Sequence, residues 1–216
     1  MASSGQRGDV VSTFSILAVE KRTGALGVAV ATGSTYVADR VPHVEPGVGA
    51  VATQGYTRVS YGPEGLGLLR RGFPPDEALR VLLRADPGRE MRQVGILDAS
   101  GRGAAHTGTA TPRWHGHIIE PGCIVLGNLI AGREVLEAML EAFRAHMEAG
   151  DGLGWSLLMA LEAGARAGGD LRGERSAALL VTMPRGPVLK LRADDEARPV
   201  EALKALWRGG KARRAL

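Results

Sequence analysis

The sequence predicts an α+β protein: a four-layer αββα sandwich of two antiparallel sheets stacked face to face, with pairs of helices on their outer faces. Three observations predict this class. Short apolar strands come as hairpins, the helices follow one another in pairs, and regular strand–helix–strand alternation is absent. The last observation argues against a doubly wound parallel sheet. At 216 residues, the chain is most simply one domain with a substantial core.

The first hairpin organises the prediction. Two apolar runs, Thr13–Glu20 and Gly24–Thr32, flank a polar turn and have the pattern of a hairpin that enters a buried sheet. Thr13 therefore stands at the mouth of the first strand, where rigid backbone would fix its Cα while its hydroxyl stays at the open end. The hairpin alone leaves two interpretations open, an ordinary strand start or an anchored nucleophile.

The remaining elements follow in order. Ser34–Pro46 is predicted to be a polar connection and Thr109–Gly122 an irregular segment. The spacing of apolar residues and the Gly and Pro signals predict the other elements. The strands are Gly47–Gln54, Arg92–Asp98, Gly103–Gly108, Gly122–Leu126, Ser176–Met183 and Val188–Arg192, and the helices are Tyr61–Gly72, Pro74–Ala85, Gly132–Met147, Trp155–Ala167 and Pro199–Trp207.

Charge and composition narrow the classes of function. The net charge is +4, but Arg208, Lys211, Arg213 and Arg214 supply four positive charges near the end of the chain, so the remainder is balanced. We therefore expect no nucleic-acid partner. Apolar runs stay below the roughly 18–20 residues that a bilayer requires, and no secretion signal is recognisable, so we expect a cytoplasmic protein without a membrane partner. The single Cys123 is expected to be a buried strand thiol.

Known catalytic motifs are absent. The sequence has no phosphate-binding glycine loop, no Gly-x-Ser-x-Gly elbow and no His-Glu-x-x-His helix. His115 and His117 could both bind a metal, but spacing places no third ligand, and we expect neither a metal nor a cofactor. Polar residues instead stand at predicted strand ends, either as caps and turns or as one site. They are Thr13, Gln54, Arg92, Asp98, Asn128, Asp170, Arg172 and Ser176.

The sequence resembles the family called domain of unknown function 1028, whose fold resembles that of the N-terminal nucleophile hydrolases. The resemblance covers about residues 13–206 and agrees with the four-layer sandwich. It rests on Thr13–Ile16, Gly47–Gln54, Tyr61–Leu66, Asp86–Gly95, Gly127–Asn128, Gly168–Asp170, Arg172–Gly173, Ser176–Leu179 and Leu191–Asp195.

This resemblance implies a hydrolase that acts on a small amide or related C–N bond. In hydrolases of that fold, the first residue of the mature chain is the nucleophile and its own α-amine is the base. Thr13 would be the nucleophile and Asn128 the oxyanion donor. Gln54, Arg92, Asp170 and Ser176 would line the site or orient the substrate. The alternative is a non-catalytic protein on the same fold that binds a small ligand or assembles with itself as a homo-oligomer.

The expected domain spans residues 13–207, between a leader at 1–12 and a basic tail at 208–216. A Thr13 that is held in a peptide bond has no free amine. The mechanism therefore requires cleavage after Ser12 or a later translation start, and a start at Val11 would make Ser12 the competing nucleophile. Arg175 stands where we expect Gln in many relatives, which questions the role of that position in a substrate pocket.

Overall fold

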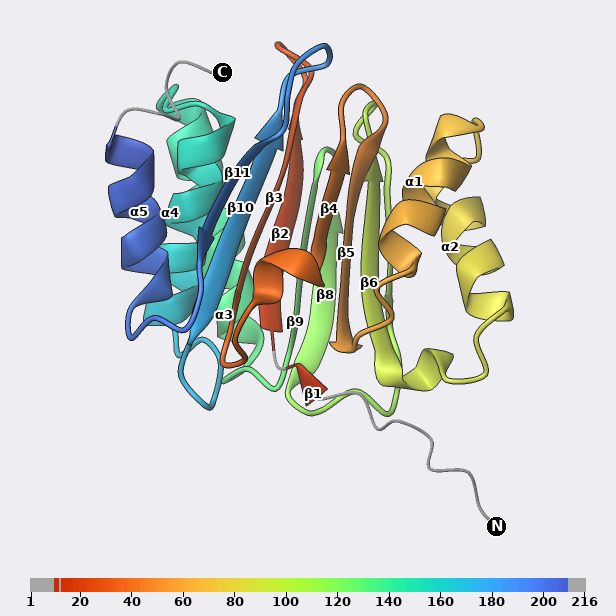
Figure 1. Cartoon of the computed structure of the whole chain (residues 1–216), viewed down its shortest axis with the longest axis horizontal. Helices are drawn as coiled ribbons and strands as arrows, with labels where there is room; N and C mark the ends of the chain where they lie inside the picture. The colour runs from red at the N-terminus through yellow and green to blue at the C-terminus, as the bar shows by residue number, and fades with distance from the viewer. Residues whose placement is uncertain (1–9, 12, 210–216) are drawn as a thin grey trace.

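The computed structural model describes residues 10, 11 and 13–209 (Figure 1). Most of the expected leader and the tail beyond residue 209 lie outside the described residues. The strands are β1 (Val10–Val11), β2 (Thr13–Glu20), β3 (Ala25–Thr32), β4 (Pro42–Glu45), β5 (Gly49–Tyr56), β6 (Arg92–Asp98), β7 (Gly103–Thr107), β8 (His115–Glu120), β9 (Cys123–Asn128), β10 (Ser176–Thr182) and β11 (Leu189–Ala193). The helices are α1 (Tyr61–Arg70), α2 (Pro75–Arg84), α3 (Arg133–Glu148), α4 (Leu153–Arg166) and α5 (Pro199–Arg208).

Within the described residues, the strands form two antiparallel sheets. The six-stranded sheet has the order β11-β10-β3-β2-β9-β8. The five-stranded sheet has the order β1-β5-β6-β7, and β4 also pairs with β5. Both expected hairpins at the ends of the chain, β2–β3 and β10–β11, are present, and β3 pairs with β10 between them.

Three layers of buried side chains separate these elements. One lies between the six-stranded sheet and α3, α4 and α5, a second lies between the two sheets, and a third lies between the five-stranded sheet and α1 and α2. Figure 1 shows the same succession of helices, sheet, sheet and helices. The predicted α+β class with two antiparallel sheets is thus confirmed, and no described helix is long and apolar enough to cross a membrane.

Small residues let these layers approach closely. A Cβ added to Gly164 of α4 would lie 2.7 Å from Met139 Cγ of α3. A Cβ added to Gly27 of β3 would lie 2.5 Å from Leu157 Cδ1 of α4. Both distances are too short for real contacts, so glycine at these positions permits the helix–helix and helix–sheet packing. A core with few aromatic residues is packed in this way from small and aliphatic side chains.

Two predictions about connections were wrong. Ser34–Pro46 contains β4, and Thr109–Gly122 contains β8. Both strands lie at sheet edges, where one side needs no hydrogen-bonding partner. Pro42 can therefore begin β4, since proline is tolerated at the first residue of an edge strand. In β8 only part of each face is buried, which leaves a weak apolar pattern in the sequence.

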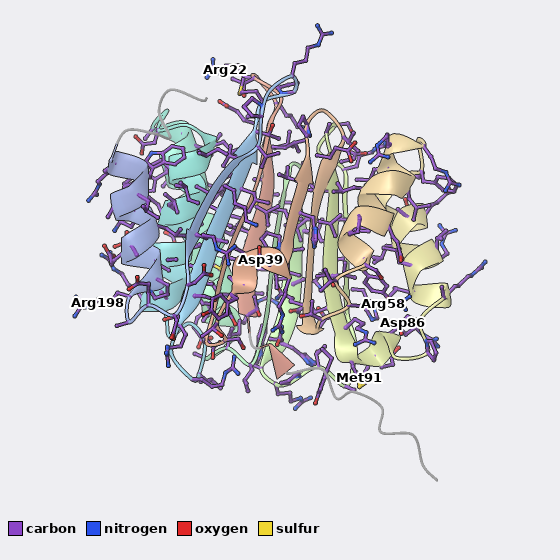
Figure 2. The ribbon with its side chains drawn as sticks, in the orientation of Figure 1. Arg22, Asp39, Arg58, Asp86, Met91 and Arg198 are labelled. Atoms are coloured by element: carbon purple, nitrogen blue, oxygen red, sulfur yellow. The ribbon has the colours of Figure 1, made fainter. Side chains whose placement is uncertain are left out.

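A polar cluster fixes the start of β6 to the adjacent helices. Asp86 accepts hydrogen bonds from Tyr61 Oη (2.8 Å) and Arg92 Nε (2.9 Å), and Arg58 pairs with it at 3.5 Å. Figure 2 shows Arg58 and Asp86 side by side, near the start of α1 and the end of α2. Burial alone raises the pKa of Asp86, but the hydrogen bonds from Arg92 and Tyr61 outweigh it and lower the pKa to about 2.

We expect Asp86→Asn to lower the free energy of unfolding by about 3 kcal/mol at pH 7, because it leaves the buried Tyr61 hydroxyl and the partly buried guanidinium groups of Arg58 and Arg92 without their carboxylate. The folded pKa lies below the unfolded value near ~3.9. The stabilisation is therefore complete above the unfolded pKa and disappears as the pH falls toward about 2. Chemical denaturation of both proteins between pH 7 and pH 2 measures this convergence.

Asp76→Asn is the matched control. The Asp76 side chain is 69% exposed and pairs with Arg80 on the same helix. We expect this control to change stability by less than about 0.5 kcal/mol. An equal effect of the two substitutions would contradict the role of the buried cluster.

Candidate functional site

Polar residues form a row along one end of the six-stranded sheet. Thr13 of β2 lies opposite Asn128 of β9, which in turn lies opposite His115 of β8. On the other side of β2, Thr32 of β3 lies opposite Ser176 of β10. Neighbouring strands lie about 4.8 Å apart. The fold therefore places the candidate residues Thr13, Asn128 and Ser176 in a single row.

This row faces the other sheet. Along β2, Phe14 and Ile16 belong to the core under the helices, whereas Leu17 belongs to the core between the sheets. Because side chains alternate along a strand, Thr13 and Ser15 also face the space between the sheets. Both are fully buried. The layer between the sheets thus changes from aliphatic to polar toward the end that carries Thr13.

A network of side-chain amides joins the two sheets here. Ser15 Oγ donates to Gln54 Oε1 at 2.6 Å, and Gln54 Nε2 donates to the Thr13 carbonyl at 3.2 Å. Gln54 Nε2 and Asn128 Nδ2 both donate to Gln93 Oε1, at 2.7 and 3.0 Å. These side chains are fully buried. Gln54 therefore fixes the backbone of Thr13 directly, and Gln93 connects Gln54 to Asn128.

Gln93 is the central residue that sequence reasoning missed. Its Nε2 lies within 2.8–2.9 Å of Thr107 Oγ1 and of the Gly116 and Gly127 carbonyls, and so its two N–H groups are shared among three acceptors. Thr107 Oγ1 also contacts His117 Nδ1 at 2.8 Å. Gln93 thereby ties β6 to β7 in its own sheet and to β8 and β9 in the facing sheet.

Asp170 and Ser176 organise the loops at the rim of this end. The Asp170 carboxylate accepts hydrogen bonds from the Gly33 N–H and from the backbone and guanidinium of Arg172. Ser176 Oγ donates to the Ser34 carbonyl at 2.7 Å. Both side chains therefore hold the turn after β3 against the loop before β10. They lie beside the amide network, at the same end of the six-stranded sheet.

Arg92 is directed away from the network. It precedes Gln93 on β6, so its side chain points to the opposite face of the sheet. There it contacts Asp86 and donates to the Tyr56 carbonyl at 2.5 Å. The structure thus separates Arg92 from the other candidate residues.

The two histidines of β8 are held by threonines. His115 Nδ1 contacts Thr111 Oγ1 at 2.6 Å, and His117 bonds to Thr107. In the part of the chain that the structure describes, no three His, Cys, Asp or Glu side chains are placed to hold a metal ion.

Two residues close before Thr13 pair with the facing sheet. Val10 and Val11 form β1, which pairs with Tyr56 and Gly55 of β5, whereas Thr13 belongs to the six-stranded sheet. Val11 and Thr13 therefore lie in different sheets. An open cavity of about 410 Å³ lies at the turn end of the β2–β3 hairpin, where Glu20, Trp155 and Trp207 line it.

Fold and site together define an α+β protein of two facing antiparallel sheets, with a buried amide network around the first residue of a central strand. The family of unknown function DUF1028 matches residues 13–203. The chain belongs to this family. The matched region begins at Thr13 and leaves the leader outside it.

The similar solved structures include another member of this family. A crystal structure of a DUF1028 protein from Silicibacter pomeroyi shares 37% sequence identity, with a TM-score of 0.86 over 93% of this chain and 87% of that one. The Anbu ancestral β-subunit from Yersinia bercovieri shares 9% identity over 94% of this chain and 96% of that one, and its TM-score of 0.37 is too low to carry an argument. No curated protein matches the sequence.

We expect Gln93→Leu to lower the free energy of unfolding by about 3 kcal/mol or more. The substitution leaves the Gln54 and Asn128 amides and two strand carbonyls without their buried partner. Thr107→Val is the matched control, since it removes only one contact of Gln93 and should cost about 1 kcal/mol. Urea denaturation measures the free energy of unfolding of both variants. Equal values for Gln93→Leu and Thr107→Val would show that the network does not hold the sheets together.

Proposed function

We propose that this protein is a hydrolase of the N-terminal nucleophile type, acting on a small amide or related C–N bond, with Thr13 as the nucleophile. One observation carries the proposal. Thr13 is the first residue of a central strand, faces the space between the sheets, and has its carbonyl held by the buried Gln54 amide. A nucleophile needs such fixed backbone, because a displacement of about 1 Å can cost two orders of magnitude in rate.

The proposed chemistry needs no histidine or metal. With the leader removed, the Thr13 α-amine takes the proton from the Thr13 hydroxyl, directly or through a water, as Oγ attacks the amide carbon. The C–N bond breaks, the leaving amine receives that proton, and an ester forms on Oγ. Water then attacks this ester, which releases the acid and restores the hydroxyl. Each amide bond cleaved consumes one water.

The neighbouring residues have distinct proposed roles. Asn128, opposite Thr13 in the adjacent strand, is the donor for the oxyanion that develops on the carbonyl oxygen. Gln54 and Gln93 position Thr13 and Asn128 through the amide network. Asp170 and Ser176 shape the rim on which the substrate rests. Arg92 acts outside the site, through Asp86, as a structural residue.

A non-catalytic role on the same fold is the second candidate, and one observation favours it. In the intact chain Thr13 is fully buried, and the strand that precedes it pairs with β5. A protein that retained this arrangement in its working form could bind a ligand or a second copy but would have no amine to act as a base.

Processing of the leader is the first test. Intact-mass measurement of the protein from its native source should give a chain that begins at Thr13. A working protein that keeps residues before Ser12 would contradict the mechanism. A chain that begins at Ser12 would instead make Ser12 the nucleophile.

We expect the processed protein to hydrolyse members of an amide library, and Thr13→Ala to lower kcat/KM by at least about 10³-fold. Asn128→Ala should lower kcat by about 10²–10³-fold, since it removes one oxyanion donor. kcat/KM should rise with pH through the pKa of the α-amine, roughly 7.7–8.0 when unperturbed, because only the neutral amine is a base.

Thr182→Ala is the matched control, since Thr182 is an equally buried threonine at the opposite end of β10. This variant should keep kcat/KM within about twofold. Equal losses in the two threonine variants would indicate a folding defect, whereas unchanged turnover in Thr13→Ala would exclude Thr13 as the nucleophile.

A further inference from the structure

The outer edge of β5 is shared by two short strands. β4 pairs with its first half, Gly49–Ala52, and β1 pairs with its end, where Val11 lies opposite Gly55 and Val10 opposite Tyr56. The edge next to the site is therefore occupied by the leader itself.

The orientation of the backbone along this edge follows from neighbouring hydrogen bonds. The Thr53 N–H donates to the Val41 carbonyl, toward the β4 side. Gly55, two residues further on, has a positive φ, so the alternation of the backbone fixes only the direction of its N–H, whereas its pairing with Val11 gives the direction of its C=O. The carbonyl of Arg92, the residue of β6 that pairs with Gly55, accepts a hydrogen bond from the N–H of Gly108, which directly follows β7. This carbonyl therefore faces away from Gly55. The Gly55 N–H and C=O therefore face Val11.

This edge lies next to Thr13. Gln54 immediately precedes Gly55, and its side chain binds the Thr13 carbonyl at 3.2 Å. In the intact chain, Val10 and Val11, the third and second residues before Thr13, are thus paired on β5 on the acyl side of Thr13. Removal of the leader would uncover the Gly55 N–H and C=O.

We infer that the Gly55–Tyr56 edge is the acyl-side subsite of the enzyme, and that the substrate is a peptide amide which pairs there as an extended strand in place of the leader. The inference rests on the proposed function for the identity of the reacting group. Backbone pairing at a free sheet edge supplies affinity with little demand on side chains. The peptide carbonyl one residue beyond the pairing position of Val11 would then take the place of the carbonyl of the leader's own scissile bond, next to Thr13.

Binding to a chain that begins at residue 13 and carries Thr13→Ala tests this without turnover. The core residues that the structure describes begin at Phe14 and are all retained in the shortened chain, and a thermal melt checks that it is folded. The probe is a fluorescent peptide with the leader sequence Gly8-Asp9-Val10-Val11-Ser12, used unmodified or with one N-methyl group.

The two N-methylated peptides, modified at the Val11 position and at the Val10 position, serve as controls for each other. N-methylation at the Val11 position removes the donor to the Gly55 carbonyl and should weaken binding at least about tenfold. N-methylation at the Val10 position, whose N–H points away from β5, should change binding less than about threefold. The full-length chain, whose edge is filled by β1, should bind the unmodified peptide at least about tenfold more weakly than the shortened chain.

Equal effects of the two methyl groups, or equal affinity of the full-length and shortened chains, would overturn the inference. Turnover of small amides with no peptide binding would also overturn it while leaving the hydrolase intact. The peptides could bind as expected while the shortened chain that keeps Thr13 hydrolyses no amide. This result would support the subsite and refute the proposed chemistry.

Discussion

The arrangement at the Thr13 end depends on one constraint: polar side chains buried between two sheets must satisfy one another. Gln54 and Gln93 lie opposite each other on β5 and β6, and both face the other sheet. An amide buried there without partners would cost several kcal/mol, so the two glutamines must meet donors and acceptors from β2, β8 and β9. The amide network therefore fixes how the two sheets are placed relative to each other at this end.

This constraint also explains why Thr13 can be held rigidly at the start of a strand. Strand ends usually fray, but the Thr13 carbonyl is bound by Gln54, and its neighbour Asn128 is bound by Gln93. The cluster around Asp86 acts on the same network from outside, since Arg92 anchors the first residue of β6 and Gln93 is the second. The start of β6 is therefore held on one face by the Asp86 cluster and on the other by the amide network, which also holds the row that contains Thr13.

Sequence patterns predicted most of the fold, because central strands and amphipathic helices carry strong apolar signals. β4 and β8 were missed since edge strands bury little on either face. In the site, Thr13, Asn128 and Ser176 were placed at strand ends and lie in one row. Sequence reasoning selected Arg92 and missed Gln93, its neighbour on β6. Because β6 is buried on both faces, no alternation of polar and apolar residues shows which of its side chains face the other sheet.

The leader and the proposed chemistry compete for the same space. β1 completes the edge of β5, which removes an unpaired strand end, and it also keeps the Thr13 nitrogen in a peptide bond. The pairing of β1 is only two residues long, whereas the network that holds Thr13 is built from side chains of β2, β5, β6 and β9. Loss of the leader would therefore remove no member of the amide network. It would leave a fixed hydroxyl, a new amine and an open strand edge side by side, which are the parts that cleavage of an extended amide requires.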